Sequence, residues 1–360
     1  MTPHERFLAL MHFKPVDKMP LWEWGPWPSA LRRWQREAIG EGKEAPQYAE
    51  CENRVSVGVD MWMRPSFEVK VLQEDAETRI EQNERGIIQR VLKNPDAMSM
   101  PHHLEYPVKT RADWEAMKER FDPADPGRFP DDWRQRCEQW RRDGPVLMTQ
   151  GPRSPSLFGL VREFMGPERA LCAFCDEPDL IHDMMEFNTE FLLELLPRVF
   201  REAPVSAVYF WEDMCYRAGP LISPAMFRRF MLPRYKRITD LARRHGVDVC
   251  FVDSDGNTEQ LIPLWIEAGI KGNYPMEVAA GMDVGKLRRQ YGRELLMHGG
   301  IDKRALAQGR EAIDKELARR VPVAQEGGYV PHVDHAVPHD VSYENFAYYW
   351  RRKKEMLGLA

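Results

Sequence analysis

Residues 247–257 read VDVCFVDSDGN, a largely apolar run that ends in two carboxylates and a glycine. A short apolar run of this kind is typical of a strand that is covered on both faces, as in a parallel sheet flanked by helices. Carboxylates directly after such a strand are typical of a site on the carboxyl edge of the sheet. The stretch therefore favours an α/β fold, provided that the rest of the chain repeats the pattern.

The pattern does recur along the 360-residue chain. Ser223, Asp283 and Ser342 are predicted N-caps of helices that follow apolar runs, and the helix capped by Ser223 is expected to reach Gly246. Eight strand–helix units predict a (β/α)8 TIM barrel. The eight runs are MPLWEW (19–24), MWMRPS (61–66), PVLMTQ (145–150), AVYFWE (207–212), VDVCFVD (247–253), IKGNYP (270–275), ELLMHG (294–299) and GYVPHV (328–333).

The segment between the second and third runs departs from this alternation. Residues 67–94 alternate apolar and polar residues around the turn signal Glu84-Arg85-Gly86, which predicts a β-hairpin. Helical segments are predicted at 111–121 and 131–142. We therefore expect one barrel domain over residues 1–360, with N-terminal helices and a hairpin and helical insertion at 67–143 between strands two and three.

The composition excludes several classes of protein. Hydrophobic residues make up 43% and charged residues 30% of the chain, and a net charge of -5 gives no reason to expect nucleic-acid binding. No stretch approaches the roughly 20 apolar residues of a membrane span, and no signal peptide is recognisable. We expect a cytoplasmic protein. The six cysteines are scattered, and the Cys172–Cys175 pair in a helical stretch is better explained by packing than by a metal.

Polar residues collect at the predicted carboxyl ends of the strands, where TIM barrels carry their sites. Asp253 and Asp255 stand two apart in an extended segment, so they would project to the same side and raise each other's pKa or share a cation. An Asx turn is the alternative. His335, beside His332 and Asp334, is a further candidate, against the alternative of a hydrogen-bonded loop histidine. This one-sided distribution favours an enzyme or a small-molecule binder.

A second group of residues near the same rim is predicted to bind substrate. Its tryptophans would suit a large flat ligand, although core packing is their alternative role. Its acidic pair Glu212-Asp213 could instead stabilise a helix N-terminus. The group consists of Trp22, Trp24, Arg64, Gln150, Trp211, Glu212, Asp213, Glu277 and His298.

Five stretches together resemble the uroporphyrinogen decarboxylase superfamily, and the likeness extends over essentially the whole chain. The resemblance implies a TIM barrel with one of two activities: decarboxylation of uroporphyrinogen, or methyl transfer from a methyl-corrinoid protein to a thiol or to tetrahydrofolate. The stretches are MTPHERFLALMHFKPVDKMPLWEWG (1–25), YFWEDMCYRAGPLISPAMFRRFMLPRYKRI (209–238), VDSDGN (252–257), MHGGIDKRAL (297–306) and GGYVPHVDHAVPHDVSYENF (327–346).

Departures from the superfamily's motifs separate the two activities. True decarboxylases carry an arginine-rich RQAGR segment for the acid groups of the tetrapyrrole, whereas this chain has WEWGPWP at 22–28. Thiol-directed methyltransferases bind zinc through HxCG and a later CGVP-like cysteine; here Asp253-Ser254-Asp255-Gly256 and His335-Ala336-Val337-Pro338 stand in those places. Aspartate and histidine are a less thiophilic ligand set. His335 also matches the histidine of the decarboxylases' GHG loop, so it does not separate the branches.

These departures favour methyl transfer between a methyl-corrinoid, as co-substrate, and a non-thiol acceptor such as tetrahydrofolate. Asp253, Asp255 or Glu212 would bind the pterin or amine, and His335 would assist proton transfer. Asp253, Asp255 and His335 are the candidate catalytic residues and also the candidate ligands of a divalent metal, zinc included.

Two alternatives remain open. One is a decarboxylase or lyase that acts on a non-porphyrin acid, with Arg64 or Arg153 holding a carboxylate. The other is a metal-binding or ligand-binding protein without turnover. The expected partners are a small-molecule substrate and a corrinoid-binding protein, and the sequence leaves the oligomeric state open, a homodimer included.

Overall fold

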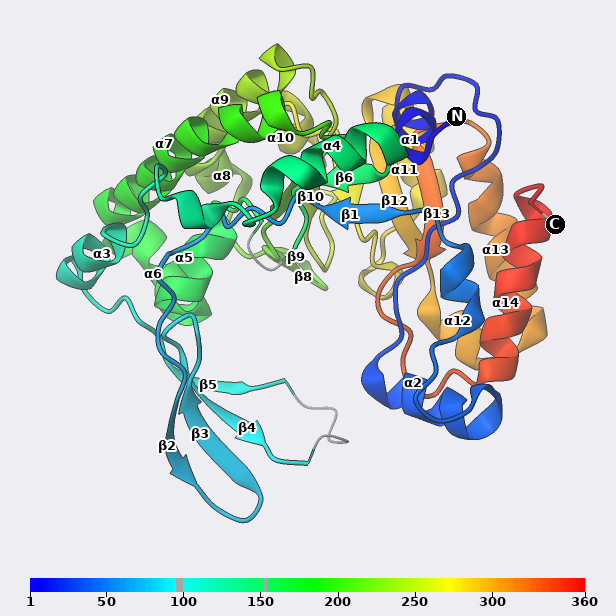
Figure 1. The fold of residues 1–360 in the computed structure, drawn as a ribbon, viewed down its shortest axis with the longest axis horizontal. Helices are drawn as coiled ribbons and strands as arrows, with labels where there is room; N and C mark the ends of the chain where they lie inside the picture. Colours follow the sequence, from blue (N-terminus) through cyan, green and yellow to red (C-terminus); the bar gives the residue numbers. More distant parts are fainter. Residues whose placement is uncertain (95–99, 152–153, 360) are drawn as a thin grey trace.

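Parallel strands occupy the centre of the structure, a computed structural model that describes residues 1–94, 100–151 and 154–359 (Figure 1). Among these residues, five strands pair in the order β13-β12-β11-β10-β7 and two more pair as β1-β6, all of them parallel. An isolated parallel bridge between Met148 and Ala207 connects β6 with the residue before β7. The strands are β1 (Arg54–Ser56), β6 (Val146–Met148), β7 (Val208–Trp211), β10 (Cys250–Asp253), β11 (Gly272–Tyr274), β12 (Leu296–Ile301) and β13 (Tyr329–Val333).

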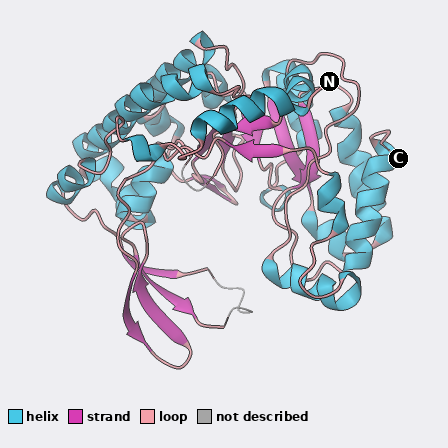
Figure 2. Cartoon of the chain, viewed as in Figure 1, coloured by secondary structure: helices cyan, strands magenta, loops and turns pink. Residues whose placement is uncertain are grey.

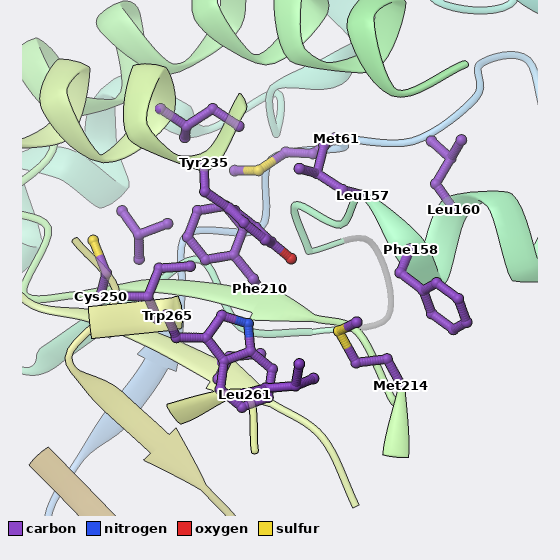
Figure 3. Packing of buried hydrophobic residues seen from close by; sticks show 14 of the residues in the cluster. Met61, Leu157, Phe158, Leu160, Phe210, Met214, Tyr235, Cys250, Leu261 and Trp265 are labelled. Carbon is purple, nitrogen blue, oxygen red and sulfur yellow. The ribbon is translucent and has the colours of Figure 1, made fainter. Parts of the chain in front are cut away.

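Successive residues of these strands belong to two different hydrophobic cores. Tyr209 of β7 and Phe251 of β10 are register partners and contribute to an inner core. Phe210, the next residue of β7, belongs to the outer core, where its ring lies 5.2 Å from that of Tyr235 at 80°. Figure 3 shows this outer packing, which also includes Trp265. Because both faces are covered, these strands are the continuous apolar runs that the sequence predicts.

The predicted strand at residues 61–66 was wrong. That segment is a loop, and the strand that pairs with β6 is β1, which comes earlier in the chain. Met61 and Trp62 are buried in the loop, with the Trp62 ring 5.8 Å from that of Phe164. The prediction failed because a buried loop and a covered strand have the same apolar composition.

The first predicted run, residues 19–24, forms no ladder, yet it lies between β1 and β13. Arg54 Nη2 donates a hydrogen bond to the Glu23 carbonyl at 2.8 Å, and Val333 N donates to Glu23 Oε1 at 2.9 Å. The Glu23 carboxylate thus accepts the hydrogen bond from Val333 N that a backbone carbonyl would accept in a regular ladder of strands. The described strands therefore form a parallel α/β arrangement whose ladders do not close into a barrel.

The predicted helix caps are present, and helices account for much of the chain in Figure 2. Ser223, Asp283 and Ser342 each accept a hydrogen bond from a backbone N–H three residues later. The helix after Ser223 is divided into two at Met231, because Pro233 lacks the N–H and crowds the preceding turn.

The expected N-terminal helices are α1, whose Phe7 and Leu10 enter the inner core, and α2. The α-helices are α1 (Pro3–Met11), α2 (Pro28–Trp34), α3 (Arg111–Lys118), α4 (Trp133–Asp143), α5 (Phe158–Met165), α6 (Pro167–Asp176), α7 (Pro178–Glu202), α8 (Pro224–Phe230), α9 (Leu232–Arg244), α10 (Ile262–Glu267), α11 (Val284–Tyr291), α12 (Lys303–Ala307), α13 (Arg310–Ala324) and α14 (Tyr343–Met356).

The insertion holds a four-stranded antiparallel sheet, larger than the predicted hairpin. Its order is β2-β3-β4-β5, and in Figure 1 it stands away from the parallel strands (cyan). The predicted turn Glu84-Arg85-Gly86 joins β3 to β4, and α3 and α4 confirm the predicted helical segments. The remaining strands are β2 (Lys70–Glu74), β3 (Thr78–Gln82), β4 (Ile88–Leu92), β5 (His102–Glu105), β8 (Cys215–Tyr216) and β9 (Gly219–Pro220).

None of the described helices combines the length and the apolar character that a membrane-spanning segment requires.

Candidate active site

Two adjoining cavities open among the carboxyl ends of the parallel strands. They measure about 430 and 320 Å³, and Trp24, Gln150 and Gly151 line both of them. Their other linings differ in character. The larger cavity is also lined by Glu23, Gly25, Arg54, Val55, Ser56, Met148, Tyr274 and His332, and the smaller one by Arg85, Ser154, Tyr209, Trp211 and Asp253.

Four carboxylates gather at the end of β10 and in the adjacent loops. Asp253 is the last residue of β10 and the register partner of Trp211. Asp255 N contacts Asp213 Oδ1 at 3.4 Å, and Gly256 N donates to Glu277 Oε2 at 2.9 Å. Asp213 has a φ of +42°, a conformation that non-glycine residues rarely adopt. The backbone is thus strained at Asp213, whose carboxylate lies at the loop after β10.

Burial and neighbouring carboxylates raise the pKa of two members of this group, Asp253 and Asp255. The pKa of Asp253 is raised well above its usual range, first by loss of water and then by the charges of Asp213 and Asp255. Loss of water and the charges of Asp213 and Glu277 raise the pKa of Asp255 to about 7. Both carboxyl groups thus hold a proton more tightly than a free aspartate does, and Asp255, with a pKa of about 7, is poised to gain or lose a proton near neutral pH.

His335 lies beside these carboxylates. Its Nε2 is 3.8 Å from Asp255 Oδ2, and its ring stacks on Trp24 at 5.1 Å and on Trp27 at 5.9 Å. Loss of water and the nearby Lys303 ammonium lower the pKa of His335, so the imidazole is neutral at pH 7. Lys303 itself lies 3.4 Å from the fully buried Asp334 carboxylate. His335 thus lies next to Asp255, slightly beyond direct hydrogen-bond distance.

The predicted metal ligands do not form a ready-made zinc centre. Among the described side chains, no group of three or more His, Cys, Asp and Glu is arranged to hold an ion. Cys215, on the wall of a neighbouring cavity with Asp255, has a pKa raised by burial to about 12, so its free side chain is a thiol. The donor groups present fit proton transfer better than thiol activation.

Glu212 lies behind the cavities rather than in them. It is fully buried, and its carboxylate accepts hydrogen bonds from Leu157 N and Gly159 N, both at 2.8 Å. The hydroxyls of Ser156 and Tyr235 donate to the same group. The structure therefore places Glu212 at the start of α5, the helix-terminal role that was the alternative to substrate binding.

Five other predicted residues also lie outside the cavity walls: Trp22, His298, Arg64, Asp213 and His335. Trp22 is fully buried and stacks on Phe7 at 5.4 Å, and His298 is buried within the inner core region. Arg64 lies in the loop that was predicted as a strand and pairs with Asp125 at 2.7 Å, so it does not reach the strand ends. Arg153 lies outside the described residues. Trp24, Gln150, Trp211 and Asp253 line the two cavities, while Asp255 and Glu277 line a third cavity beside them, of about 420 Å³.

Sequence reasoning missed several residues that line the cavities, among them Arg54, Arg85 and Tyr209. Arg54 lies in a three-residue strand too short to give an apolar signal. Arg85 comes from the β3–β4 turn of the antiparallel sheet, which only the fold brings to the cavity. Tyr209 could have been found, because alternation along β7 puts it on the same side as Trp211.

Comparisons with known proteins agree on one family. A family model described as uroporphyrinogen decarboxylase (URO-D) matches residues 156–356. A uroporphyrinogen decarboxylase of Pseudomonas fluorescens strain Pf-5 is 22% identical over 361 residues, which span 95% of this chain and 94% of that protein. The chloroplastic uroporphyrinogen decarboxylase 2 of Oryza sativa subsp. japonica is 20% identical over 181 residues, which span 49% and 44% of the two chains.

A solved structure, a methyltransferase from Methanosarcina mazei, superposes with a TM-score of 0.57 over 99% of both chains, at 15% identity. At this identity the likeness establishes a shared fold.

Proposed function

The chain belongs to the uroporphyrinogen decarboxylase (URO-D) family, and from this premise we propose that it is a methyltransferase of that family. It moves a methyl group between a methyl-corrinoid, carried by a corrinoid-binding protein, and a non-thiol acceptor such as tetrahydrofolate. In this proposal residues 19–25 complete an eight-membered barrel, and the acceptor binds at the carboxyl ends of its strands. The observation that carries the proposal is the acidic group formed by Asp213, Asp253, Asp255 and Glu277.

This acidic group disfavours a polyanionic tetrapyrrole. Each substrate carboxylate about 4 Å from an ionised aspartate would raise the energy by roughly 1–4 kcal/mol. Two nearby arginines are already engaged: Arg162 donates to the Asp213 carbonyl at 2.8 Å, and Arg85 forms an ion pair with Glu163. A neutral or weakly basic amine, in contrast, gains hydrogen bonds from these carboxyl groups.

The same group can handle the proton that methyl transfer to an amine releases. The nitrogen lone pair forms the new C–N bond, the bonding pair of the donor stays with the corrinoid, and the amine N–H loses its proton. Asp255, with a pKa of about 7, accepts that proton, and the neutral His335 lies 3.8 Å away. The raised pKa of Asp253 favours its protonated form, which donates a hydrogen bond to the acceptor.

The direct test mixes the protein with methylcobalamin and tetrahydrofolate and follows the cobalamin absorption spectrum. We expect demethylation with wild type and a rate lower by about 10²-fold or more with Asp255→Asn. Asp240→Asn is the matched control, because Asp240 pairs with Arg243 on the exposed surface of α9. Absence of demethylation with tetrahydrofolate and with other amine acceptors would contradict the proposal.

One observation favours the second candidate, a decarboxylase or lyase on a small non-porphyrin acid. Arg54 lines the larger cavity, where its guanidinium lies 4.6 Å from the Trp22 ring centroid. It could hold one substrate carboxylate while the protonated Asp253 supplies a proton to the carbon that loses carbon dioxide. Release of labelled carbon dioxide from a carboxylic acid, lost in Arg54→Gln, would support this candidate instead.

A further inference from the structure

A buried chain of hydrogen bonds runs from Tyr209, which lines the smaller cavity, to His332, which lines the larger one. The Tyr209 hydroxyl is bonded to His298 Nε2. His298 Nδ1 is 2.9 Å from His332 Nε2, and His332 Nδ1 is 2.7 Å from the Val333 carbonyl oxygen. Tyr209, His298 and His332 are each about 1% exposed. The established family and the proposed chemistry leave this chain without a role.

The last acceptor fixes the direction of every bond in the chain. A carbonyl oxygen only accepts, so His332 must carry its proton on Nδ1. A neutral His332 then accepts at Nε2, which puts the proton of His298 on Nδ1. His298 Nε2 accepts in turn, so the Tyr209 O–H is the donor. Burial supports neutral rings, because it lowers the pKa of His332 to about 3 and the pKa of His298 well below its usual range.

The phenol oxygen of Tyr209 therefore keeps only lone pairs for a further hydrogen bond, and the residue lines the smaller cavity with Trp211 and Asp253. We propose that Tyr209 is a specificity-determining residue, an obligate hydrogen-bond acceptor that selects a ligand group carrying N–H or O–H. This inference rests on the proposed function, since it names the feature of the acceptor that the site recognises: an unmethylated amine, whose N–H is bonded to Tyr209 before methyl transfer and passes to Asp255 after the new C–N bond has formed. It predicts discrimination between tetrahydrofolate, which has an N5–H, and 5-methyltetrahydrofolate, which lacks it.

Relay of a substrate proton along the chain is the competing role. It would leave His332 as an imidazolium, although the pKa of His332 is about 3. At pH 7 that state is disfavoured by about 10⁴-fold. A fixed acceptor is therefore the better assignment than a proton relay.

Histidine ¹⁵N NMR tests the direction of the chain without any ligand. We expect His298 and His332 to show a protonated Nδ1 and an unprotonated Nε2, unchanged from about pH 6 to pH 9. Tyr209→Phe should shift the ¹⁵N resonance of His298 Nε2, and this shift assigns the resonance. A proton on His298 Nε2 would overturn the inference, because Tyr209 would then be free to donate.

Ligand binding tests the selectivity. In wild type, tetrahydrofolate should bind more tightly than 5-methyltetrahydrofolate, as followed by quenching of tryptophan fluorescence. Tyr209→Phe should weaken tetrahydrofolate about tenfold and leave the methylated folate nearly unchanged. Tyr329→Phe is the matched control, since that buried tyrosine donates to the Gly299 carbonyl at 2.7 Å and is absent from the lining of both cavities among the described residues.

The outcomes separate this inference from the proposed function. If neither folate binds to wild type, the proposed function fails, and the tautomers of His298 and His332 still decide whether Tyr209 is a fixed acceptor. If both folates bind and Tyr209→Phe weakens them equally, the selectivity is wrong while the function stands.

Discussion

Asp255 is the residue whose ionisation should govern activity near neutral pH, because its pKa is raised to about 7. If it accepts the amine proton, only its ionised form is active. We therefore expect kcat/KM for methyl transfer to tetrahydrofolate to rise with pH and to level off above about pH 8. Asp255→Asn should remove this inflection. A wild-type profile that is flat between about pH 6 and pH 8 would exclude Asp255 as the base.

The same residue should make folding stability depend on pH. A carboxyl with a raised pKa binds its proton more tightly in the folded state, so its contribution to stability is complete below about pH 4, the ordinary carboxyl range. That contribution declines as the pH rises toward about 7, the pKa in the folded protein.

Asp255→Asn should therefore be more stable than wild type at about pH 8, with no difference near pH 4. Because the side chain is 46% exposed, water screens the effect, and we expect a gain of about 1 kcal/mol or less. Urea unfolding at both pH values measures it. Equal stabilities at about pH 8 would show that the Asp255 pKa is not raised.

The acidic group shows how much of the site a sequence can predict. Asp253 and Asp255 follow an apolar run directly, so their place at a strand end could be predicted. The roles of Glu212 and Arg64 could not, because each depends on contacts distant in sequence: Glu212 with the start of α5, and Arg64 with Asp125.

Among the elements, α5 depends on Glu212 for its N-terminus. That carboxylate accepts two backbone N–H bonds and two hydroxyl bonds in a fully buried setting. Glu212→Gln keeps the shape but turns an amide NH2 toward these donors. We expect a loss of about 2–4 kcal/mol in the free energy of unfolding, with KM nearly unchanged in the folded fraction. Urea unfolding and steady-state kinetics check this, and a selective rise in KM would restore Glu212 as a substrate ligand.

The antiparallel sheet is held at the cavity through Arg85. Its guanidinium pairs with Glu163 and lies 5.6 and 5.4 Å from the ring centroids of Trp62 and Trp211. Arg85→Ala should loosen the sheet and speed proteolysis within strands β2 to β5 several-fold, as read by mass spectrometry of limited digests. Arg79→Ala is the control, since Arg79 pairs with Glu81 within the sheet itself. Equal digestion of the two variants would show that Arg85 does not anchor the sheet.

Strand positions were predictable where both faces are covered, as in β7, β10, β12 and β13. Strand positions were not predictable where side-chain hydrogen bonds or loop packing take the place of the backbone hydrogen bonds between strands. Met61 and Trp62 are apolar because they fill a core from a loop, while β1 carries a charged residue, Arg54, at its start. Composition cannot distinguish these cases, since the difference lies in what packs against the segment.

For the whole molecule, the N-terminal segment is held between the first and last strands by one buried ion pair. Lys353 Nζ of α14 lies 2.6 Å from Glu23 Oε2, and both side chains are 0% exposed. Glu23 also accepts from Val333 N at 2.9 Å and from the Tyr349 hydroxyl at 2.6 Å. Glu23 and Lys353, which are 330 residues apart in sequence, thus meet where the proposed barrel closes.

Removal of one partner of the Glu23–Lys353 ion pair should loosen the contact between the N-terminal segment and β13. Lys353→Met leaves the Glu23 carboxylate buried without its cation, which should lower the free energy of unfolding by about 3–5 kcal/mol. Amide hydrogen exchange should rise in peptides that contain residues 21–27 and 329–337, because Val333 N donates to the same carboxylate. Lys354→Met is the control, since Lys354 pairs with Glu50 near the surface and its loss should cost less than about 1 kcal/mol.

The double variant Glu23→Gln with Lys353→Met tests whether the ion pair or the packing around it keeps the N-terminal segment against β13. With both charges removed, no unpaired ion remains buried, so most of the lost stability should return. The amide side chain introduced at position 23 would still offer a carbonyl oxygen to Val333 N, and exchange in residues 329–337 should fall back toward the wild-type rate. If exchange there is unchanged in every variant, the N-terminal segment is held by other contacts, and the proposed closure through Glu23 is wrong.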